Sequence, residues 1–136
     1  MPRIEAVGFE PFEVPQGTRL VRALEDNGVD ILHRCGGYAK CTTCRVEFVE
    51  GEPERMTVAE RDRLEAKGVL GEVRLSCQVE CTHDMRLRPV NLFSQSGLSD
   101  PGPQPEDHIT PDPEWIEAPR QRQEMLWDTG QAPLAP

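Results

Sequence analysis

The stretch "CGGYAKCTTC", residues 35–44, places three of the chain's five cysteines within ten residues. Two glycines follow the first cysteine, and two threonines separate the second cysteine from the third. Three thiols on one glycine-containing loop are compatible with a disulfide, a zinc site, a reactive nucleophile or an iron–sulfur cluster. The rest of the sequence favours some of these four over the others.

The length of the sequence indicates the number of domains, and its apolar content and its start indicate the compartment. A chain of 136 residues suits one domain with an appendage. It has no apolar run of membrane-spanning length, and its start, "MPRIEAVGFE", lacks the apolar stretch of a secretory signal. We therefore expect a cytoplasmic protein, in which thiols stay reduced and gather for metals or for chemistry. The odd number of cysteines also argues against a disulfide framework.

The charge is unevenly distributed along the chain. Residues 1–99 hold 13 basic and 16 acidic side chains, whereas residues 100–136 hold 2 and 8, and the net charge is −9. An acidic protein cannot release the counterions of nucleic acid or bind anionic lipid by charge. We therefore expect no nucleic-acid partner, no membrane insertion, and an attraction toward basic protein surfaces.

Hydrophobic periodicity and turn residues predict an α+β domain with a mixed sheet. Thr18 is the expected N-cap of the first helix, and Thr57 with Glu60 forms the expected capping box of the second. The expected order is a strand pair, helix, strand, helix, strand and strand, at residues 3–17, 18–28, 45–52, 57–68, 73–81 and 85–90.

The composition changes after about Ser94. Eight of the 13 prolines fall in residues 100–136, among acidic and small polar residues, which is typical of a solvated linker. Both tryptophans, Trp115 and Trp127, also lie there. We therefore divide the chain into a domain at 1–95 and a proline-rich acidic extension at 96–136. The tryptophans favour docking of the extension on the domain, on a partner or on a second copy of the chain.

The cysteine spacing suits a 2Fe–2S cluster. Five residues separate Cys35 from Cys41, two separate Cys41 from Cys44, and 32 separate Cys44 from Cys77. Each of two irons needs two thiolates, so a loop that wraps the cluster closely can supply three and a distant strand the fourth. The glycines after Cys35 allow the necessary backbone turns. Nearby amides and the hydroxyls of Thr42 and Thr43 would stabilise the added electron.

"CGGYAKCTTCRVEF", followed later by "RLSCQ", resembles the 2Fe–2S ferredoxins of the β-grasp fold over roughly residues 3–92. The five-residue first spacing is similar to the adrenodoxin-like and related bacterial branch. The resemblance implies a one-electron carrier rather than an enzyme, working between a ferredoxin reductase and a redox acceptor enzyme. It implies the cluster ligands Cys35, Cys41, Cys44 and Cys77. A cluster-bearing sensor, or a component of a larger redox assembly, is the alternative.

Other uses of the cysteines remain open at this point. A zinc ion could take Cys41 and Cys44 with Cys77 and Cys81, although this leaves Cys35 without a purpose. A catalytic Cys35 would need His33 as its base, but we expect His33 to be a surface residue at a helix exit.

The choice between Cys77 and Cys81 as fourth ligand is not decided by periodicity. In an extended chain both would point to the same face, about 13 Å apart at roughly 3.3 Å per residue. The choice of Cys77 rests on the resemblance of "RLSCQ" to the ligand strand of the family. Cys81 is then an ordinary buried thiol.

Overall fold

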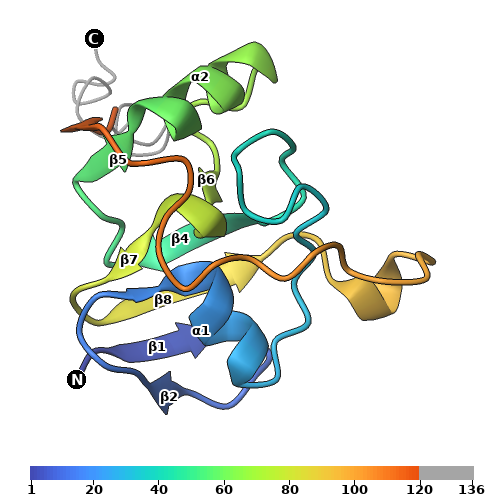
Figure 1. Cartoon of the computed structure of the whole chain (residues 1–136). Coiled ribbons are helices and arrows are strands. Elements are labelled where there is room, and N and C mark those ends of the chain that lie inside the picture. The colour runs from blue at the N-terminus through green and yellow to red at the C-terminus, as the bar shows by residue number, and fades with distance from the viewer. Residues whose placement is uncertain (120–136) are drawn as a thin grey trace, which may run out of the picture.

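A five-stranded mixed sheet forms the centre of the computed structural model, which describes residues 1–119 (Figure 1). Strands β1 and β8 run parallel, and the other neighbouring strands run antiparallel. The strand order is β2 (Phe12–Glu13), β1 (Arg3–Ala6), β8 (Met85–Pro89), β4 (Arg45–Glu50) and β6 (Arg74–Leu75). The expected mixed α+β arrangement is confirmed.

The first helix, α1 (Leu20–Asp26), buries the predicted apolar stripe of Leu20, Val21, Ala23 and Leu24. The prediction that Thr18 caps it is wrong. Thr18 and Arg19 form the short strand β3, and the N-cap is Arg19 with no side-chain capping bond. The Thr18 hydroxyl donates instead to the Pro15 carbonyl at 2.7 Å.

The second helix, α2 (Val58–Ala66), has the predicted N-cap, because Thr57 Oγ1 accepts from the Glu60 amide at 3.1 Å. The reciprocal half of the capping box is wrong. The Glu60 carboxylate turns inward and binds Arg74 Nε at 2.8 Å and the Leu75 amide at 2.8 Å. Glu60 thus links α2 to β6.

The single strand predicted over 73–81 is wrong. After β6 the chain makes a 3-10 turn, Ser76–Gln78, and then forms β7 (Glu80–Cys81), which pairs with β3 rather than with the main sheet. The turn forms because the Ser76 amide and hydroxyl both donate to the Cys44 carbonyl, at 3.1 and 2.8 Å. This contact holds the turn against the cysteine loop.

The extension packs on the domain as far as it is described. In Figure 1 it leaves a short 3-10 turn, Phe93–Gln95, and crosses in front of α1 as the orange segment. It ends in β9 (Trp115–Glu117), which pairs antiparallel with β5 (Arg55–Thr57). We call residues 100–111 the strap. The predicted docking is thus observed for Trp115, whereas Trp127 lies outside the described residues.

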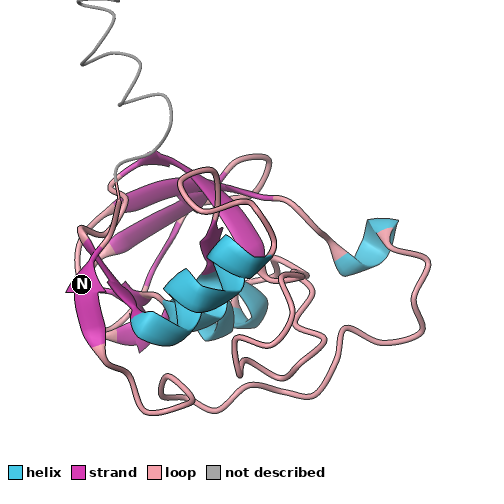
Figure 2. Ribbon diagram, turned by 90° about the horizontal axis from the view of Figure 1, so that it is seen from above, coloured by secondary structure: helices cyan, strands magenta, loops and turns pink. Residues whose placement is uncertain are grey.

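Figure 2 shows α1 and α2 to one side of the strands, with long loops around them. The core between these layers is built from aliphatic residues of the sheet and of α1, with Cys44, Cys77 and Cys81 among them. Within residues 1–119 no helix is long and apolar enough to span a bilayer.

Candidate metal centre

The loop from Cys35 to Cys44 is curled by three residues with positive φ. Gly36 has φ 73°, Gly37 has φ 91° and Ala39 has φ 59°. This region favours glycine, because a Cβ there meets the following carbonyl oxygen. The two glycines therefore adopt the curl without strain, whereas Ala39 adopts it at a cost.

The curl directs backbone amides at the Cys35 sulfur. A hydrogen bond from the Cys41 thiol, with the amides of Lys40, Cys41 and Gly37, lowers the pKa of Cys35 to about 4 against the opposing effect of burial. Amides in this position stabilise a thiolate, which is the form that binds iron. The expected N–H contacts of the loop are therefore present around Cys35.

The four predicted ligands come together as two pairs. The Cys41 thiol donates to Cys35, and the Cys77 thiol donates to Cys44. That bond lowers the pKa of Cys44 and, together with burial, raises that of Cys77. Cys35 and Cys41 are half-buried, whereas Cys44 and Cys77 are buried. The charge of Cys35 also acts on Cys44.

Of the two threonines expected near the sulfurs, Thr43 lies there. Its hydroxyl is 3.1 Å from the Cys41 sulfur. The Thr42 hydroxyl instead accepts from Arg45 Nη2 at 2.6 Å, which braces the start of β4. Thr43 is therefore the hydroxyl that can stabilise a thiolate.

Cys81 lies apart from the two pairs. It sits in β7 opposite Thr18, buried, and the charge of Glu80 adds to burial in raising the pKa of Cys81 to about 12. A thiol with this pKa stays protonated at neutral pH and behaves as a small apolar side chain.

The arrangement does not match the four-cysteine zinc set considered above. Cys41 pairs with Cys35 rather than with Cys44, and Cys81 lies on β7. Within residues 1–119, no group of three or more His, Cys, Asp or Glu side chains is placed to hold a single metal ion. Two pairs of thiols suit a centre with two irons, each of which takes two thiolates.

Arg19 borders the site and was not foreseen from the sequence. It is 1% exposed and donates from Nε to the Cys77 carbonyl at 2.7 Å and from Nη2 to the Gly37 carbonyl at 2.6 Å. Burial lowers the pKa of Arg19, and the nearby charges of Cys77, Cys44 and Cys35 oppose that shift.

Gln78 is a second unforeseen neighbour. It is fully buried, and its Nε2 donates to the Thr110 carbonyl at 2.8 Å while lying 3.7 Å from the Cys77 sulfur. Its Oε1 accepts from the Thr57 hydroxyl at 2.6 Å. Gln78 therefore ties Cys77 to α2 and to the strap.

His33 is buried, so the prediction of a surface histidine is wrong. Its Nε2 lies 2.7 Å from Glu25 Oε2, and the Pro101 carbonyl accepts from its backbone amide. This ring nitrogen is engaged with Glu25, and the Cys35 sulfur has the Cys41 thiol and backbone amides as its partners. The arrangement gives no support to a catalytic Cys35.

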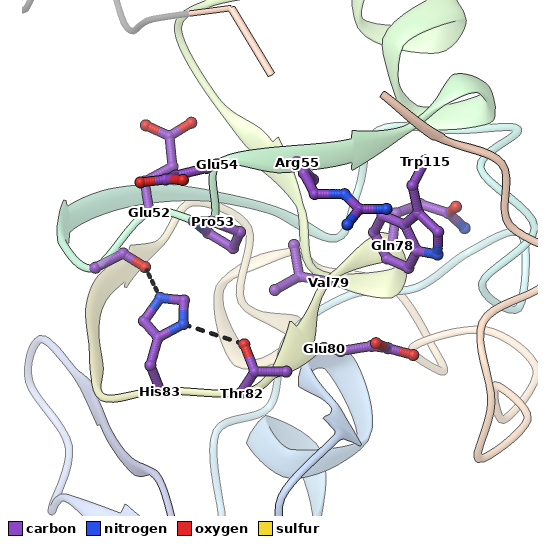
Figure 3. A pocket seen from close by; sticks show the side chains of 11 residues that line it. Glu52, Pro53, Glu54, Arg55, Gln78, Val79, Glu80, Thr82, His83 and Trp115 are labelled. Carbon is purple, nitrogen blue, oxygen red and sulfur yellow. Dashed lines mark hydrogen bonds between the residues drawn. The ribbon is translucent and has the colours of Figure 1, made fainter. Parts of the chain in front are cut away.

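A hollow lies beside the cysteine site rather than in it. It has a volume of about 650 Å³, and its walls come from residues 51–55, from 78–80, from Thr82 and His83, and from Trp115 of β9 (Figure 3). His83 closes one side by bonding the Gly51 carbonyl at 2.7 Å. None of its walls comes from the four predicted ligands.

Neither Arg19 nor Gln78 carries a signal in the local pattern. Arg19 precedes the apolar stripe of α1, where an arginine is usually solvated, and its acceptors lie 18, 58 and 87 positions away. Gln78 follows a cysteine within the supposed strand. Only the tertiary fold brings their partners to them.

A family model described as a 2Fe-2S iron-sulfur cluster binding domain matches residues 8–82. The chain is 34% identical over 85 residues to 2Fe-2S ferredoxin-5 of Aquifex aeolicus, which covers 59% of this chain and 88% of that protein. It is 34% identical over 80 residues to one polypeptide of the Na(+)-translocating NADH-quinone reductase of Methylococcus capsulatus. That match covers 59% of this chain but only 19% of the reductase polypeptide.

Among solved structures, the ISC-like [2Fe-2S] ferredoxin FdxB of Pseudomonas putida is similar in fold. The TM-score is 0.54 at 26% identity, over 65% of this chain and 91% of that chain. The mixed sheet with two helices is therefore the β-grasp arrangement of these ferredoxins, as the cysteine motif predicted.

Proposed function

Since this chain belongs to the family of 2Fe-2S iron-sulfur cluster binding domains, we propose that it carries single electrons between a reductase and a redox enzyme. The bound 2Fe–2S cluster supplies the one-electron chemistry. The chain itself makes and breaks no bond in this function. Its residues hold the cluster, exclude water from it and present it to partners.

The proposed ligands are Cys35, Cys41, Cys44 and Cys77. The observation that carries this assignment is their grouping into two pairs, Cys35 with Cys41 and Cys44 with Cys77. Each pair supplies the two thiolates that one iron requires. The amides around Cys35 and the hydroxyl of Thr43 would stabilise negative charge on these sulfurs.

The proposed ligands differ in burial, so one side of the site lies closer to solvent than the other. Cys44 and Cys77 are buried, whereas Cys35 and Cys41 are half-buried at the surface loop. We infer that electrons enter and leave on the side of Cys35 and Cys41. Tyr38, 44% exposed at the tip of this loop, would then meet the partner.

The partners we propose are a ferredoxin reductase with a basic surface and an acceptor enzyme. Support comes from the strap, which passes beside the cysteine loop and contacts Arg34 and Arg19. It carries the exposed acidic residues Asp100, Glu106 and Asp107. Exposed opposite charges speed the encounter of two proteins and are screened by salt. Self-association through the extension has no support among the described residues, because this part packs on its own domain.

A component of a larger redox assembly is the second candidate. The chain spans about a fifth of the length of the Na(+)-translocating NADH-quinone reductase polypeptides that it matches. In both cases we place the redox centre in residues 1–95, with residues 96–136 as the extension. We place the protein in the cytoplasm, where its thiols would stay reduced.

The test is an absorption spectrum of freshly purified protein, with iron and sulfide analysis. We expect charge-transfer bands in the visible that bleach when one electron per chain is added. A colourless protein loaded with zinc would overturn the proposal. A reduction rate with a basic reductase that stays flat as sodium chloride rises would overturn the acidic docking alone.

A further inference from the structure

Arg19 is a buried positive charge whose shortest hydrogen bonds go to backbone carbonyls. Its guanidinium is 1% exposed and bonds three carbonyls, those of Cys77, Gly37 and Glu106, at 2.7, 2.6 and 2.8 Å. The hydroxyl of Thr110 lies 3.4 Å from Nη2. Within residues 1–119 no carboxylate forms an ion pair with it. A charge buried in this way needs an opposite charge nearby, because burial without one is costly.

Arg74 provides the comparison within the same molecule. It is also buried, but it bonds the fully buried Glu60 at 2.8 Å and Glu52 at 3.2 Å. The fold therefore supplies carboxylates to its other fully buried arginine. At Arg19 the charges that act on the guanidinium are those of the sulfurs of Cys77, Cys44 and Cys35, which are negative as thiolates.

We propose that Arg19 is the fixed counter-charge of the redox centre and favours its reduced form, and that the strap holds Arg19 in this place. The inference rests on the proposed function. Reduction brings one electron from an external donor and releases nothing, so the negative charge within the four sulfurs rises by one. A positive charge that is fixed by burial beside the sulfurs stabilises this more negative, reduced form.

The strap supplies the outer half of the Arg19 site. The Glu106 carbonyl and the Thr110 hydroxyl, both on the strap, contact the guanidinium. Pro103 and Pro105 lie against Gly36 and Gly37, close enough that a Cβ on either glycine would come within 3.3 Å of a proline carbon. The strap thus replaces water over the loop, and charges interact more strongly where water is excluded.

Gly102 fixes the strap at its beginning. It has φ 115°, and a Cβ there would lie 2.4 Å from the His33 carbonyl oxygen. Gly97 also has positive φ, 75°, but a Cβ there meets nothing within 4 Å. A methyl group at Gly102 therefore pushes the strap away from the loop, whereas one at Gly97 only strains the backbone.

The first experiment measures the midpoint potential of the full-length, cluster-loaded chain in a spectroelectrochemical cell. Arg19→Gln removes the charge but keeps amide donors for the carbonyls, and Arg19→Lys keeps the charge. We expect Arg19→Gln to lower the reduction equilibrium constant about tenfold, which is 59 mV more negative for one electron. Arg19→Lys should stay near the parent chain.

Arg61→Met is the matched control for net charge. Arg61 is 43% exposed and pairs with its neighbour Asp62 on the surface. We expect a small shift that disappears in 1 M salt, where the Debye length is about 3 Å, whereas the Arg19→Gln shift remains. Equal potentials for Arg19→Gln and the parent would overturn the inference, as would a shift equal to that of Arg61→Met at every salt concentration.

The second experiment compares Gly102→Ala with Gly97→Ala and does not alter Arg19. We expect Gly102→Ala to shift the potential in the negative direction and to raise hydrogen exchange at the amides of residues 33–37, with Gly97→Ala unchanged in both. If the Arg19 variants do not fold, the comparison of Gly102→Ala with Gly97→Ala tests the proposal without them. No shift in Gly102→Ala, with exchange raised, would remove the role of the strap.

The two proposals fail separately. A parent chain without bands that bleach on one-electron reduction refutes the carrier function. A parent chain that shows them, with Arg19→Gln at the parent potential, refutes only the role of Arg19.

Discussion

At the scale of single residues, Gly37 is the point where the cysteine loop, Arg19 and the strap meet. Its carbonyl accepts from Arg19 Nη2 at 2.6 Å and from Thr110 Oγ1 at 3.2 Å. A Cβ on it would lie 2.6 Å from Arg19 Nη2 and 3.1 Å from Pro105 Cβ. The missing side chain is therefore needed both for φ 91° and for the close approach of two other segments.

We predict that Gly37→Ala lowers both the free energy of unfolding and the iron content more than Gly28→Ala does. Gly28 has φ 90° but a Cβ there meets nothing within 4 Å, so it reports the backbone cost alone, about 1–2 kcal/mol. Gly37→Ala adds the displacement of Arg19 and Pro105. Chemical denaturation and the iron content of both variants check this. Equal losses of stability and equal iron content would contradict it.

Cys77 and Cys81 should respond differently to replacement by serine. Cys77→Ser removes a sulfur of the buried pair with Cys44, so the cluster should be lost or its spectrum shifted by oxygen ligation. Cys81 lies on β7 opposite Thr18, and Cys81→Ser should keep the native spectrum and potential. The visible spectra of the two variants decide the assignment. The reverse result would move the fourth ligand to Cys81.

At the scale of elements, the start of α2 is joined to the segment that carries Cys77. Thr57 accepts from the Glu60 amide and donates to Gln78 Oε1 at 2.6 Å, so one hydroxyl serves the helix and the 3-10 turn together. Glu60 adds the link to Arg74 and Leu75. The helix thereby orients the turn that presents Cys77.

We predict that Thr57→Val lowers the free energy of unfolding by about 1–3 kcal/mol, because it removes an N-cap and leaves a buried amide oxygen without its donor. Thr18→Val is the control, since the Thr18 hydroxyl donates only to the nearby Pro15 carbonyl at the surface. Urea denaturation of both variants measures the difference. A loss for Thr18→Val as large as for Thr57→Val would contradict the double role of Thr57.

Elements with local causes were predictable from the sequence. The apolar spacing of α1 and the Thr57 cap depend on residues within a few positions, and both are observed. The mixed sheet followed from the order of the expected elements and from the resemblance to a family. The break at 76–78 was not predictable, because its cause is the Cys44 carbonyl, 32 positions away.

Contacts with residues far away in the sequence also explain the wrong predictions for two polar residues, Thr18 and His33. Thr18 is of a residue type that is favoured at N-caps, but its pairing with Cys81 holds it in a strand. His33 was expected at the surface, yet the Pro101 carbonyl from the extension covers its backbone amide. A local pattern cannot indicate that a proline-rich segment returns over a histidine and an arginine.

At the scale of the whole molecule, the extension joins parts of the domain that lie far apart in the sequence. The strap bonds α1 through Arg22, whose Nη1 donates to the Pro105 carbonyl at 2.9 Å, and it covers the cysteine loop. Further on, β9 pairs with β5 next to α2. Figure 1 shows this path from the right of the molecule across its front to β5.

We predict that Ile109→Ala destabilises the domain by about 2–5 kcal/mol, as expected for a large-to-small change at a well-packed site. Ile109 is buried although it lies in a proline-rich acidic segment. Asp107→Ala, at a side chain 87% exposed, is the control and should change stability by less than about 0.5 kcal/mol. Thermal melts of both variants test this. Indistinguishable melts would show that the extension contributes nothing to the stability of the domain.

The path of the strap also implies an order of events in time. Its bonds to the domain join residues 73 and 87 positions apart, as from Thr110 to Gly37 and from Arg19 to Glu106. Contacts across such long loops form late in folding, because the chain must first lose the entropy of closing them. The surfaces that receive the strap must also exist before it can close. Assembly of the metal centre would then belong to the interval in which the loop is folded and its cover is still open.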